Sequence, residues 1–513
     1  MYNFASVADR NASRHPDKTV LSQGDRQLTN REFHARVGAL AAGLRELGIV
    51  RGDIVALLLY NHLEFIETIF AVNRIGAAFL PLNYRLSPAE WEFILGHSDA
   101  VALVTEPEFA DAITGEGPLH RVLLRQCRPG WLSYEDIVAR HAGAHVPVEP
   151  VGPDDLQRLM YTSGTTSRPK GVRITHANHL FKNLGHLVEF GITGADTTLV
   201  CGPLYHVGGL DLPGLGTLHA GGSLIVLRRF DAREVLDTIE ARRPTNVWLA
   251  PSMMNAVLRL PDLADRDTSS LRFIIGGGEK MPVPLVERIR SAFPGAWFAD
   301  AYGLTETVSG DTFNDAEHMV SKVGSVGRPV AHLRVRVVDE QDAEVPDGQL
   351  GEITLSGPKV FAGYWRDDEA TAKVLRDGWF HTGDIGRVDE DGYLYVEDRK
   401  KDMIVSGGEN IATPEVERVL YEHPDVIEAA VVGMPHERWG EVPKAFVVRR
   451  PGSSLDAAEL TTHCRTRLAK FKVPAEIQFL AELPRTPSGK VLKRDLRSPA
   501  DRAVTGPAPA VGS

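Results

Sequence analysis

The stretch at 161–171, YTSGTTSRPKG, combines clustered hydroxyl groups with two glycines and one lysine. Gly164 and Gly171 allow backbone N–H groups to turn toward a ligand, and Lys170 adds a positive charge. The apolar segment 156–161 before it predicts a buried strand, and the run from His176 predicts the start of a helix. Because a strand, a small-residue loop and a helix together are typical of phosphate sites, the stretch predicts an α/β fold that holds a polyphosphate. A serine- and threonine-rich surface loop is the alternative interpretation.

The stretch does not match the Walker A pattern of nucleotide-binding loops. That pattern needs a serine or threonine directly after its lysine, whereas Lys170 follows Arg168 and Pro169 and is followed by Gly171. The sequence therefore disfavours Ras-like and kinase-like proteins.

Size and composition indicate a soluble protein of several domains. The chain has 513 residues, of which 43% are hydrophobic and 24% charged, and its net charge is −11. This negative charge disfavours sequence-independent binding to nucleic acid or to an anionic membrane. The scattered cysteines, Cys127, Cys201 and Cys464, predict reduced thiols in the cytoplasm and no zinc site. We also expect no signal peptide and no membrane span, because the longest apolar run, 54–60, is too short to cross a bilayer.

The first half of the chain alternates apolar runs with helical patterns, which predicts parallel sheets covered by helices on both faces. The expected strands are 54–60, 78–82, 224–227, 246–250 and 272–275, and the expected helices are 62–75, 232–242 and 283–292.

Further along, the pattern changes twice. Short alternating segments at about 322–397 predict a small antiparallel barrel or sheet within a large N-terminal domain that covers 1–398. A charged stretch then predicts a linker at 399–402, followed by a small α+β domain at 403–497 and a disordered tail at 498–513. At the start of this small domain, Thr413 is expected to be the N-cap of a helix, with Pro414 in its first turn.

Other short motifs carry groups suited to nucleotide binding. In ADAYGLTET at 299–307, Tyr302 offers a flat aromatic face, and Thr305 and Glu306 offer the hard oxygen atoms that Mg²⁺ prefers. In HTGDIG at 381–386, Asp384 can accept hydrogen bonds from two adjacent hydroxyls. The glycines of GGGEK at 276–280 would let a ligand lie along the backbone. Each motif by itself also fits an ordinary turn.

Taken in order from 161 to 490, these motifs resemble those of the adenylate-forming superfamily of acyl-CoA synthetases, luciferases and peptide-synthetase adenylation domains. The likeness is greatest to fatty-acid and aryl-acid–CoA ligases. One departure is Ser167, where the family usually has glycine. The resemblance implies a large N-terminal domain, built of two parallel-type sheets with helices and a small β-barrel, and a small mobile α+β C-terminal domain.

The resemblance implies ATP and Mg²⁺ as cofactors. Tyr302 would stack on adenine, Asp384 and Arg399 would bind the ribose, Thr305 would contact phosphate, and Glu306 would hold Mg²⁺. The residues that the resemblance assigns to the nucleotide are Thr162, Ser163, Gly164, Thr165, Thr166, Lys170, Gly278, Glu279, Asp300, Ala301, Tyr302, Gly303, Asp384 and Arg399.

The resemblance also implies a catalytic lysine and a hinge. Lys490, in the turn PRTPSGK at 484–490, takes the place of the lysine that contacts the substrate carboxylate and the α-phosphate. Lys401 takes the place of the hinge about which the small domain rotates between two half-reactions.

By the same resemblance, the segment 203–209 lines an acyl pocket, with His206 gating it at the adenylate. The expected pocket residues are Val207, Trp248, Met253, Gly276 and Gly277, and those for CoA are Gly407, Gly408, Trp439, Phe471 and Lys472. A core position is the alternative for Trp439 and Phe471.

We therefore expect an enzyme that converts a carboxylic acid and ATP to an acyl-adenylate and pyrophosphate, then transfers the acyl group to CoA. An amine acceptor is the main alternative. An amino acid substrate is disfavoured because Val207 stands where an acidic residue would hold its amine. A non-catalytic binding protein is disfavoured because the expected catalytic residues are present. The acid could be fatty or aromatic, or polar-substituted if Asp211 faces the pocket, and the protein could be a monomer or homodimer.

Overall fold

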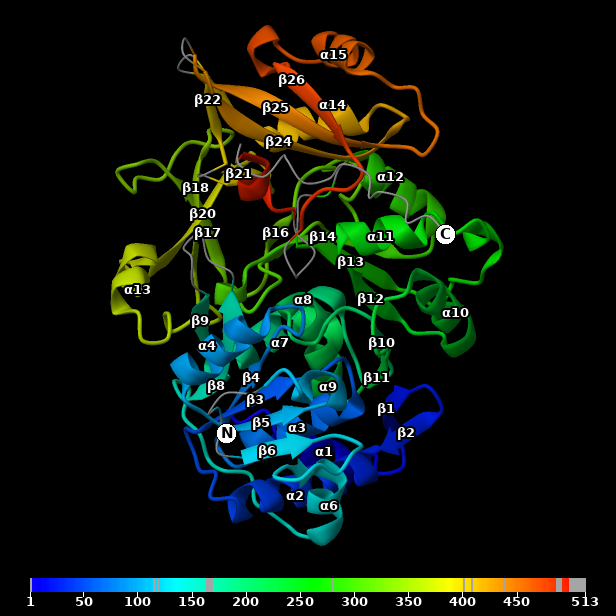
Figure 1. Ribbon diagram of the computed structural model, residues 1–513, viewed down its shortest axis with the longest axis vertical. Helices are drawn as coiled ribbons and strands as arrows, with labels where there is room; N and C mark the ends of the chain where they lie inside the picture. The colour runs from blue at the N-terminus through cyan, green and yellow to red at the C-terminus, as the bar shows by residue number, and fades with distance from the viewer. Residues whose placement is uncertain are drawn as a thin grey trace, which may run out of the picture.

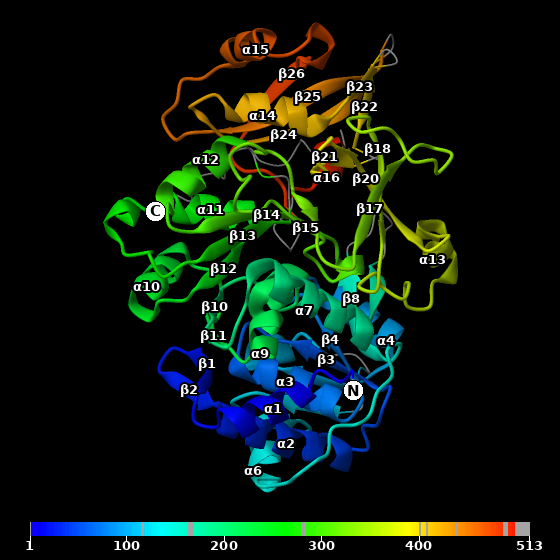
Figure 2. The same ribbon diagram turned by 180° about the vertical axis from the view of Figure 1, so that it is seen from behind.

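The computed structural model describes residues 2–113, 117, 120–162, 169–278, 281, 283–399, 402–406, 409–436, 439–485 and 491–497. The described chain forms two large, mainly parallel sheets, a smaller antiparallel sheet and a C-terminal α+β unit at one end of the long axis (Figures 1 and 2). The mixed α/β architecture predicted from the sequence is therefore confirmed. Within the described residues, no helix is both long enough and apolar enough to pass through a bilayer.

The first large sheet lies at the N-terminal end of the molecule (Figure 1). Its described strands run in the order β7-β6-β5-β3-β4-β8-β9, and all neighbours are parallel except β8 and β9. They span Leu132–Ser133, His120–Leu123, Ala100–Thr105, Ile54–Leu58, Ala78–Pro81, Leu156–Thr162 and Lys170–Thr175, respectively. The accompanying helices are α2 (Asn30–Glu46), α3 (Leu63–Arg74), α4 (Pro88–Ser98), α5 (Pro107–Ala110) and α6 (Tyr134–Arg140). β3 and β4 are buried along their whole length, as their continuous apolar sequences require.

The second large sheet has the described strand order β16-β15-β14-β13-β12-β10-β11-β1-β2. The six strands from β14 to β1 are parallel, and antiparallel strands close both edges. In sheet order the strands span Arg328–Pro329, Thr312–Phe313, Trp297–Tyr302, Phe273–Gly277, Asn246–Leu249, Thr197–Val200, Ser223–Val226, Thr19–Gln23 and Arg26–Thr29. The helices of this part are α1 (Ser6–Arg14), α7 (His176–Phe190), α8 (Val207–Leu210), α9 (Gly216–Ala220), α10 (Ala232–Arg242), α11 (Pro251–Val257) and α12 (Val283–Ala292).

The antiparallel sheet follows in the chain and is built from β17 (Arg334–Val338), β18 (Gly351–Ser356), β19 (Leu375–Arg376), β20 (Trp379–Val388) and β21 (Leu394–Arg399). Helix α13 (Asp368–Val374) precedes β19. In β20 and β21, Asp384 and Arg399 are direct register partners. The described strands of this sheet span 334–399, and the sequence pattern predicted an antiparallel barrel or sheet at about 322–397.

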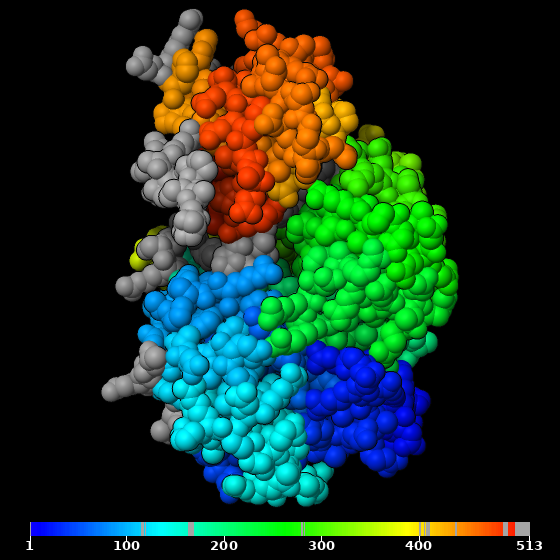
Figure 3. Space-filling model, turned by 45° about the vertical axis from the view of Figure 1, so that its right-hand side comes forward, coloured from blue at the N-terminus to red at the C-terminus, as the bar shows by residue number. Residues whose placement is uncertain are grey.

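The C-terminal unit has the described strand order β23-β22-β25-β24, with β26 beside β25. Its strands are β22 (Ile404–Ser406), β23 (Glu409–Ile411), β24 (Val426–His436), β25 (Gly440–Arg449) and β26 (Glu476–Leu480), and its helices are α14 (Thr413–Tyr421), α15 (Ala457–Arg465) and α16 (Lys493–Arg497). Figure 3 shows its orange and red surface resting on the green surface of the second large sheet's region.

The predicted strand at 156–161 and the predicted helix start at His176 are confirmed by β8 and α7. The sequence analysis missed β9, which lies between them and pairs antiparallel with β8. One local prediction was wrong. At α14 the N-cap is Ala412 rather than Thr413, whose hydroxyl and backbone N–H both donate to Oδ2 of Asp398 at 2.8 Å. The Thr413 hydroxyl thus forms a hydrogen bond between the small unit and Asp398, near the end of β21.

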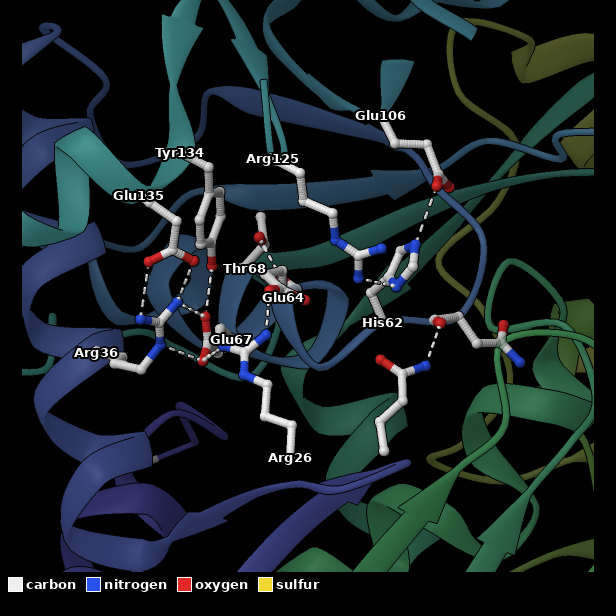
Figure 4. A network of polar contacts seen from close by, with 12 residues as sticks. Arg26, Arg36, His62, Glu64, Glu67, Thr68, Glu106, Arg125, Tyr134 and Glu135 are labelled. Atoms are coloured by element: carbon white, nitrogen blue, oxygen red, sulfur yellow. Dashed lines mark hydrogen bonds and ion pairs between the residues drawn. The ribbon is translucent and has the colours of Figure 1, made fainter. Parts of the chain in front are cut away.

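Largely buried polar side chains form a network of contacts in the N-terminal region (Figure 4). Glu106 accepts hydrogen bonds from His62 Nε2 at 3.0 Å and from Arg228 at 2.8 Å, and Arg125 lies 2.9 Å from the other ring nitrogen of His62. These contacts help to lower the pKa of Glu106 to about 2 although its burial acts in the opposite direction. The carboxylate therefore stays charged and paired throughout the usual pH range.

Candidate active site

Tyr302, Asp384 and Arg399 meet where β14 approaches the β20–β21 pair. Tyr302 is the last residue of β14, and its hydroxyl donates to Oδ2 of Asp384 at 2.7 Å. Nε of Arg399 lies 3.3 Å from the other carboxylate oxygen. The structure thus brings together three residues that the sequence assigned to one nucleotide, and their separation along the chain shows that the fold creates the cluster.

The environment keeps the Tyr302 hydroxyl protonated. Its burial, followed by the neighbouring charge of Asp384, raises the pKa of Tyr302 well above its usual range. The next residue, Gly303, has no room for a side chain, because a Cβ atom there would lie 2.3 Å from the backbone nitrogen of Gly310. This close approach requires a glycine directly after Tyr302, where β14 ends.

Asp300 and Ala301 lie on the same strand and are buried. Asp300 is the register partner of Gly276, and Ala301 that of Gly277. A Cβ atom at Gly277 would lie 2.7 Å from the carbonyl oxygen of Ala301. These strand-end glycines are therefore required for the packing of β13 against β14, in addition to any contact with a ligand.

Glu306 lies in the short helical turn Thr305–Thr307 that follows β14. One of its carboxylate oxygens accepts a hydrogen bond of 2.9 Å from the hydroxyl of Tyr364, and its backbone oxygen accepts one of 2.7 Å from the N–H of Phe361. Lys170 Nζ lies 4.9 Å from the centre of the Tyr364 ring. Tyr364 thus links the acidic turn to the first residue of β9, and its motif, FAGYW at 361–365, was not singled out from the sequence.

The oxygen donors of this turn suit a magnesium ion. Thr305 offers a hydroxyl and Glu306 a carboxylate, and Mg²⁺ commonly binds through one or two carboxylates while keeping water and substrate phosphates as its other ligands. Among the described residues, no cluster of three or more acidic, histidine or cysteine side chains could hold a metal by itself. A metal at Glu306 would therefore depend on the phosphates of a bound nucleotide.

The hairpin between β8 and β9 carries the phosphate-loop motif. Thr162 and Lys170 are register partners at its base, and Gly171 packs between the side chains of Tyr161 and Trp365. Ser163, Gly164, Thr165 and Thr166 lie outside the described residues. Thr162 and Lys170 thus place the two ends of the loop next to Tyr364.

The expected acyl pocket is built around Trp248 on β12. The ring of His206 stacks over its indole with centroids 6.2 Å apart, and Nδ1 of His206 accepts from the N–H of Gly208 at 3.0 Å, which caps α8. A Cβ atom at Gly202 or Gly208 would come within 2.5 Å of the indole. A Cβ atom at Gly278 would lie 4.0 Å from the same ring, in ordinary contact range. The glycines therefore let a flat aromatic wall stand next to the end of β13.

Val207 and Met253 belong to the same apolar cluster as Trp248 and Tyr302. Val207 is buried, whereas Met253 is half-buried. The residues expected to line the acyl pocket are thus connected to Tyr302 by apolar packing.

Asp211 does not face a substrate. It is fully buried, with Oδ2 2.7 Å from Arg158 and Oδ1 3.3 Å from Lys182. The suggestion that it marks a polar substituent on the acid was wrong, because both of its charge partners lie in the protein core.

Of the residues expected to contact CoA, Trp439, Phe471 and Lys472 lie in described parts of the C-terminal unit. The side chains of Trp439 and Phe471 are 44% and 40% exposed, so they are not core residues. Lys472 donates to both carboxylate oxygens of Glu415, at 2.8 and 2.7 Å. Gly407, Gly408, Lys401, Lys490 and Glu279 lie outside the described residues.

A cavity of about 830 Å³ lies elsewhere, between α1, α7 and α9, and is lined by Arg10, Arg14 and Lys18. Lys18 donates to the carbonyl oxygen of Gly221 at 2.6 Å, and Arg10 donates to that of His219. Two of the cations that line this cavity thus bind carbonyl groups at the end of α9. We therefore interpret them as capping groups of that helix.

Comparisons with known proteins agree with this geometry. A family model described as AMP-binding enzyme matches residues 8–365, and one described as AMP-binding enzyme C-terminal domain matches residues 415–490. A feruloyl-CoA synthase from Amycolatopsis sp is 43% identical over 490 residues, which cover 95% of this chain and 97% of the relative.

Solved structures share the whole architecture. An anthranilate CoA ligase in complex with anthranoyl-AMP superposes with a TM-score of 0.89 at 29% identity, covering 96% of each chain. An amide bond synthetase from Marinactinospora thermotolerans superposes with a TM-score of 0.87 at 29% identity, covering 96% of this chain and 99% of that one.

Proposed function

The chain belongs to the AMP-binding enzyme family, and we propose that it is an AMP-forming ligase that joins an aromatic carboxylic acid to CoA. The observation that carries this proposal is the convergence of Tyr302, Asp384 and Arg399 beside the turn that holds Glu306. This cluster offers an aromatic face, a carboxylate for two ribose hydroxyls and a hard oxygen ligand in one place.

In the first half-reaction a carboxylate oxygen of the acid attacks the α-phosphorus of ATP. A phosphorus–oxygen bond forms to the acid, the bond from the α-phosphorus to the bridging oxygen breaks, and pyrophosphate leaves with the electron pair. Mg²⁺, when bound with Glu306 as a ligand, would neutralise negative charge on the phosphate oxygens. Lys170 at the base of the hairpin would attract the departing pyrophosphate, and Lys490 would stabilise the charge that builds on the α-phosphate.

In the second half-reaction the thiolate of CoA attacks the carbonyl carbon of the acyl-adenylate, and AMP leaves. Exposed aromatic rings at Trp439 and Phe471 are available to stack on the nucleotide end of CoA. We propose that the C-terminal unit rotates at 399–402 between the half-reactions, bringing the 405–411 loop toward the adenylate in place of Lys490.

An aromatic acid is favoured by the aromatic residues among those expected to line the pocket. The rings of His206 and Trp248 stack on each other, and glycines at Gly202 and Gly208 let the buried indole approach the backbone. The relative named feruloyl-CoA synthase and the neighbour that holds anthranoyl-AMP carry aromatic acids in their names.

An amine acceptor is a second candidate, because an amide bond synthetase shares the whole fold. The two functions use the same adenylate and differ only in the nucleophile that attacks it.

One experiment tests both. Pyrophosphate release is measured across a panel of aromatic and fatty acids, with CoA, with an amine or with neither, and the acyl products are identified by mass spectrometry. We expect acyl-CoA from aromatic acids; amide formation without thioester would favour the second candidate. Lys490→Ala serves as the control, since it should lose acid-dependent exchange of pyrophosphate into ATP while still transferring the acyl group from supplied acyl-AMP. Absence of pyrophosphate release with every acid would refute the proposal.

A further inference from the structure

The turn that follows Glu306 is held in an unusual backbone conformation. Val308, Ser309 and Gly310 have φ angles of 61°, 64° and 62°, so three consecutive residues are left-handed. This region is disfavoured for residues with side chains, above all for a β-branched valine. Such a conformation persists only where surrounding contacts impose it.

Backbone hydrogen bonds from Ser309 and Asp311 and a contact of 3.1 Å between His186 Nε2 and the carbonyl oxygen of Gly310 supply some of those contacts. Lys359 supplies the charged ones. Its Nζ donates to the carbonyl oxygens of Ser309 at 2.9 Å and Gly310 at 2.6 Å, and lies 2.8 Å from Oδ1 of Asp311. The other oxygen of Asp311 accepts from the hydroxyl of Thr307. Lys359 and Asp311 are both buried, so the ammonium group has exchanged water for three oxygen atoms of this one turn.

The segment that carries Lys359, which we call the strap (358–365), also contacts the acidic turn and the hairpin. Phe361 and Tyr364 bind the backbone and side chain of Glu306, as described above. At its far end, the N–H of Trp365 donates to the carbonyl oxygen of Gly171 at 2.7 Å. The strap therefore joins the Thr305–Glu306 turn to β9 through protein contacts alone.

We propose that Lys359 is a positioning residue for the metal–phosphate site, which fixes the left-handed turn and so the direction in which Thr305 and Glu306 point. The proposal rests on the proposed function but assigns a role to a residue that touches neither nucleotide nor acid. Removal of Lys359 alone would leave two carbonyls and the Asp311 carboxylate buried without a cation. A double substitution that removes both charges is therefore the informative variant.

The test compares Lys359→Gln/Asp311→Asn with the wild type by calorimetric titration of a non-hydrolysable ATP analogue, with and without Mg²⁺, and of AMP. We expect the tightening of analogue binding by Mg²⁺ to fall at least about tenfold in the variant. AMP, which reaches Tyr302 and Asp384 but lacks the β- and γ-phosphates, should bind within about twofold of the wild type. Unchanged tightening by Mg²⁺ in the folded variant would overturn the proposal.

Two further variants complete the design. Lys182→Gln removes another buried lysine, 3.3 Å from Asp211, and should leave the effect of Mg²⁺ unchanged. A loss equal to that of the double variant would show a general packing effect and overturn the proposal.

Lys359→Arg serves if the double variant does not fold. It keeps the charge, but the donors of its planar fork cannot reach all three oxygens that surround the Lys359 ammonium, so we expect the tightening by Mg²⁺ to fall by less than the tenfold expected for the double variant. Wild-type behaviour of Lys359→Arg in that case would also overturn the proposal. Failure of the wild type to release pyrophosphate with any acid would instead refute the proposed function.

Discussion

The hydroxyl of Tyr302 donates to Oδ2 of Asp384 at 2.7 Å, and this bond joins the second large sheet to the antiparallel sheet. Arg399 approaches the other oxygen of the same carboxylate. Both oxygens that would accept hydrogen bonds from ribose hydroxyls therefore have protein partners, and each oxygen can accept a second hydrogen bond. Because the pKa of Tyr302 is well above its usual range, this donor is present at every physiological pH.

This arrangement predicts different outcomes for two conservative substitutions. Tyr302→Phe keeps the aromatic ring and frees Oδ2, so the Kd for ATP should stay within about threefold of the wild type. Asp384→Asn keeps the size but removes the charge and one acceptor oxygen, and should raise that Kd about tenfold or more. Calorimetric titration with ATP measures both. Equal weakening by the two variants would contradict the assignment of the carboxylate as the ribose ligand.

The hydrogen bond from Tyr364 predicts how Glu306 can be changed without unfolding its turn. Glu306→Gln keeps an oxygen acceptor for the Tyr364 hydroxyl at 2.9 Å but loses the negative charge that would bind Mg²⁺. We expect acid-dependent exchange of pyrophosphate into ATP to fall about 100-fold or more, with little change in melting temperature.

Tyr364→Phe is the matched control for that change. It removes the hydrogen bond and leaves the charge, so exchange should fall by about tenfold at most. A larger loss in Tyr364→Phe than in Glu306→Gln would show that orientation, and not charge, is the main contribution of Glu306.

The sequence was informative where local pattern decides structure. The helices at 232–242 and 283–292 were predicted with the bounds that the structure has, because amphipathic periodicity and flanking strands are local signals. β9 was missed because Lys170 and Gly171 belong to the loop motif, which hides the short strand that they begin. The hairpin is stabilised by pairing with β8 and by the strap, and neither contact is visible in a local window.

In the candidate site, too, local motifs indicated some residues, whereas residues whose partners are distant in sequence were misassigned or missed. Tyr302, Asp384 and Glu306 were assigned to the candidate site because their residue types and neighbours match family motifs, although nothing in the sequence predicted the 2.7 Å contact between Tyr302 and Asp384. Asp211 was misassigned because its partners, Arg158 and Lys182, are distant in sequence, so an isolated acid beside a pocket motif resembled a ligand group. Lys359 was not recognised for the same reason, since its acceptors lie in a turn about 50 residues away.

The contact between Trp248 and its flanking glycines predicts a change in acid selectivity. Trp248→Leu removes part of the flat wall, so the ratio of kcat/KM values should move toward bulkier aromatic acids by about tenfold. Gly208→Ala should shift selectivity the other way, because its methyl group would lie 2.4 Å from the indole and must displace the ring. Competition assays with paired acids of different size measure both ratios. A shift in the same direction for both variants would contradict the position of Trp248 in the pocket wall.

Buried histidines predict a loss of stability in mild acid. Burial lowers the pKa of His176 to about 4, and burial together with Arg10 lowers the pKa of His219 to about 4, against an ordinary value of 6.5. Above pH 6.5 both rings are neutral in the folded and unfolded chain. As the pH falls from 6.5 to 4, the unfolded chain binds protons that the folded chain excludes, so the free energy of unfolding decreases by at most roughly 3 kcal/mol for each ring.

The variant His176→Leu isolates this contribution, because neither ring nitrogen of His176 has a hydrogen-bond partner. We expect the fall in melting temperature between pH 7 and pH 5 to be smaller in His176→Leu than in the wild type. His15→Gln, at an exposed position, is the control and should keep the wild-type pH dependence. Differential scanning calorimetry at both pH values measures the difference. If His176→Leu loses as much stability in acid as the wild type, protonation of this buried ring does not contribute to the acid sensitivity.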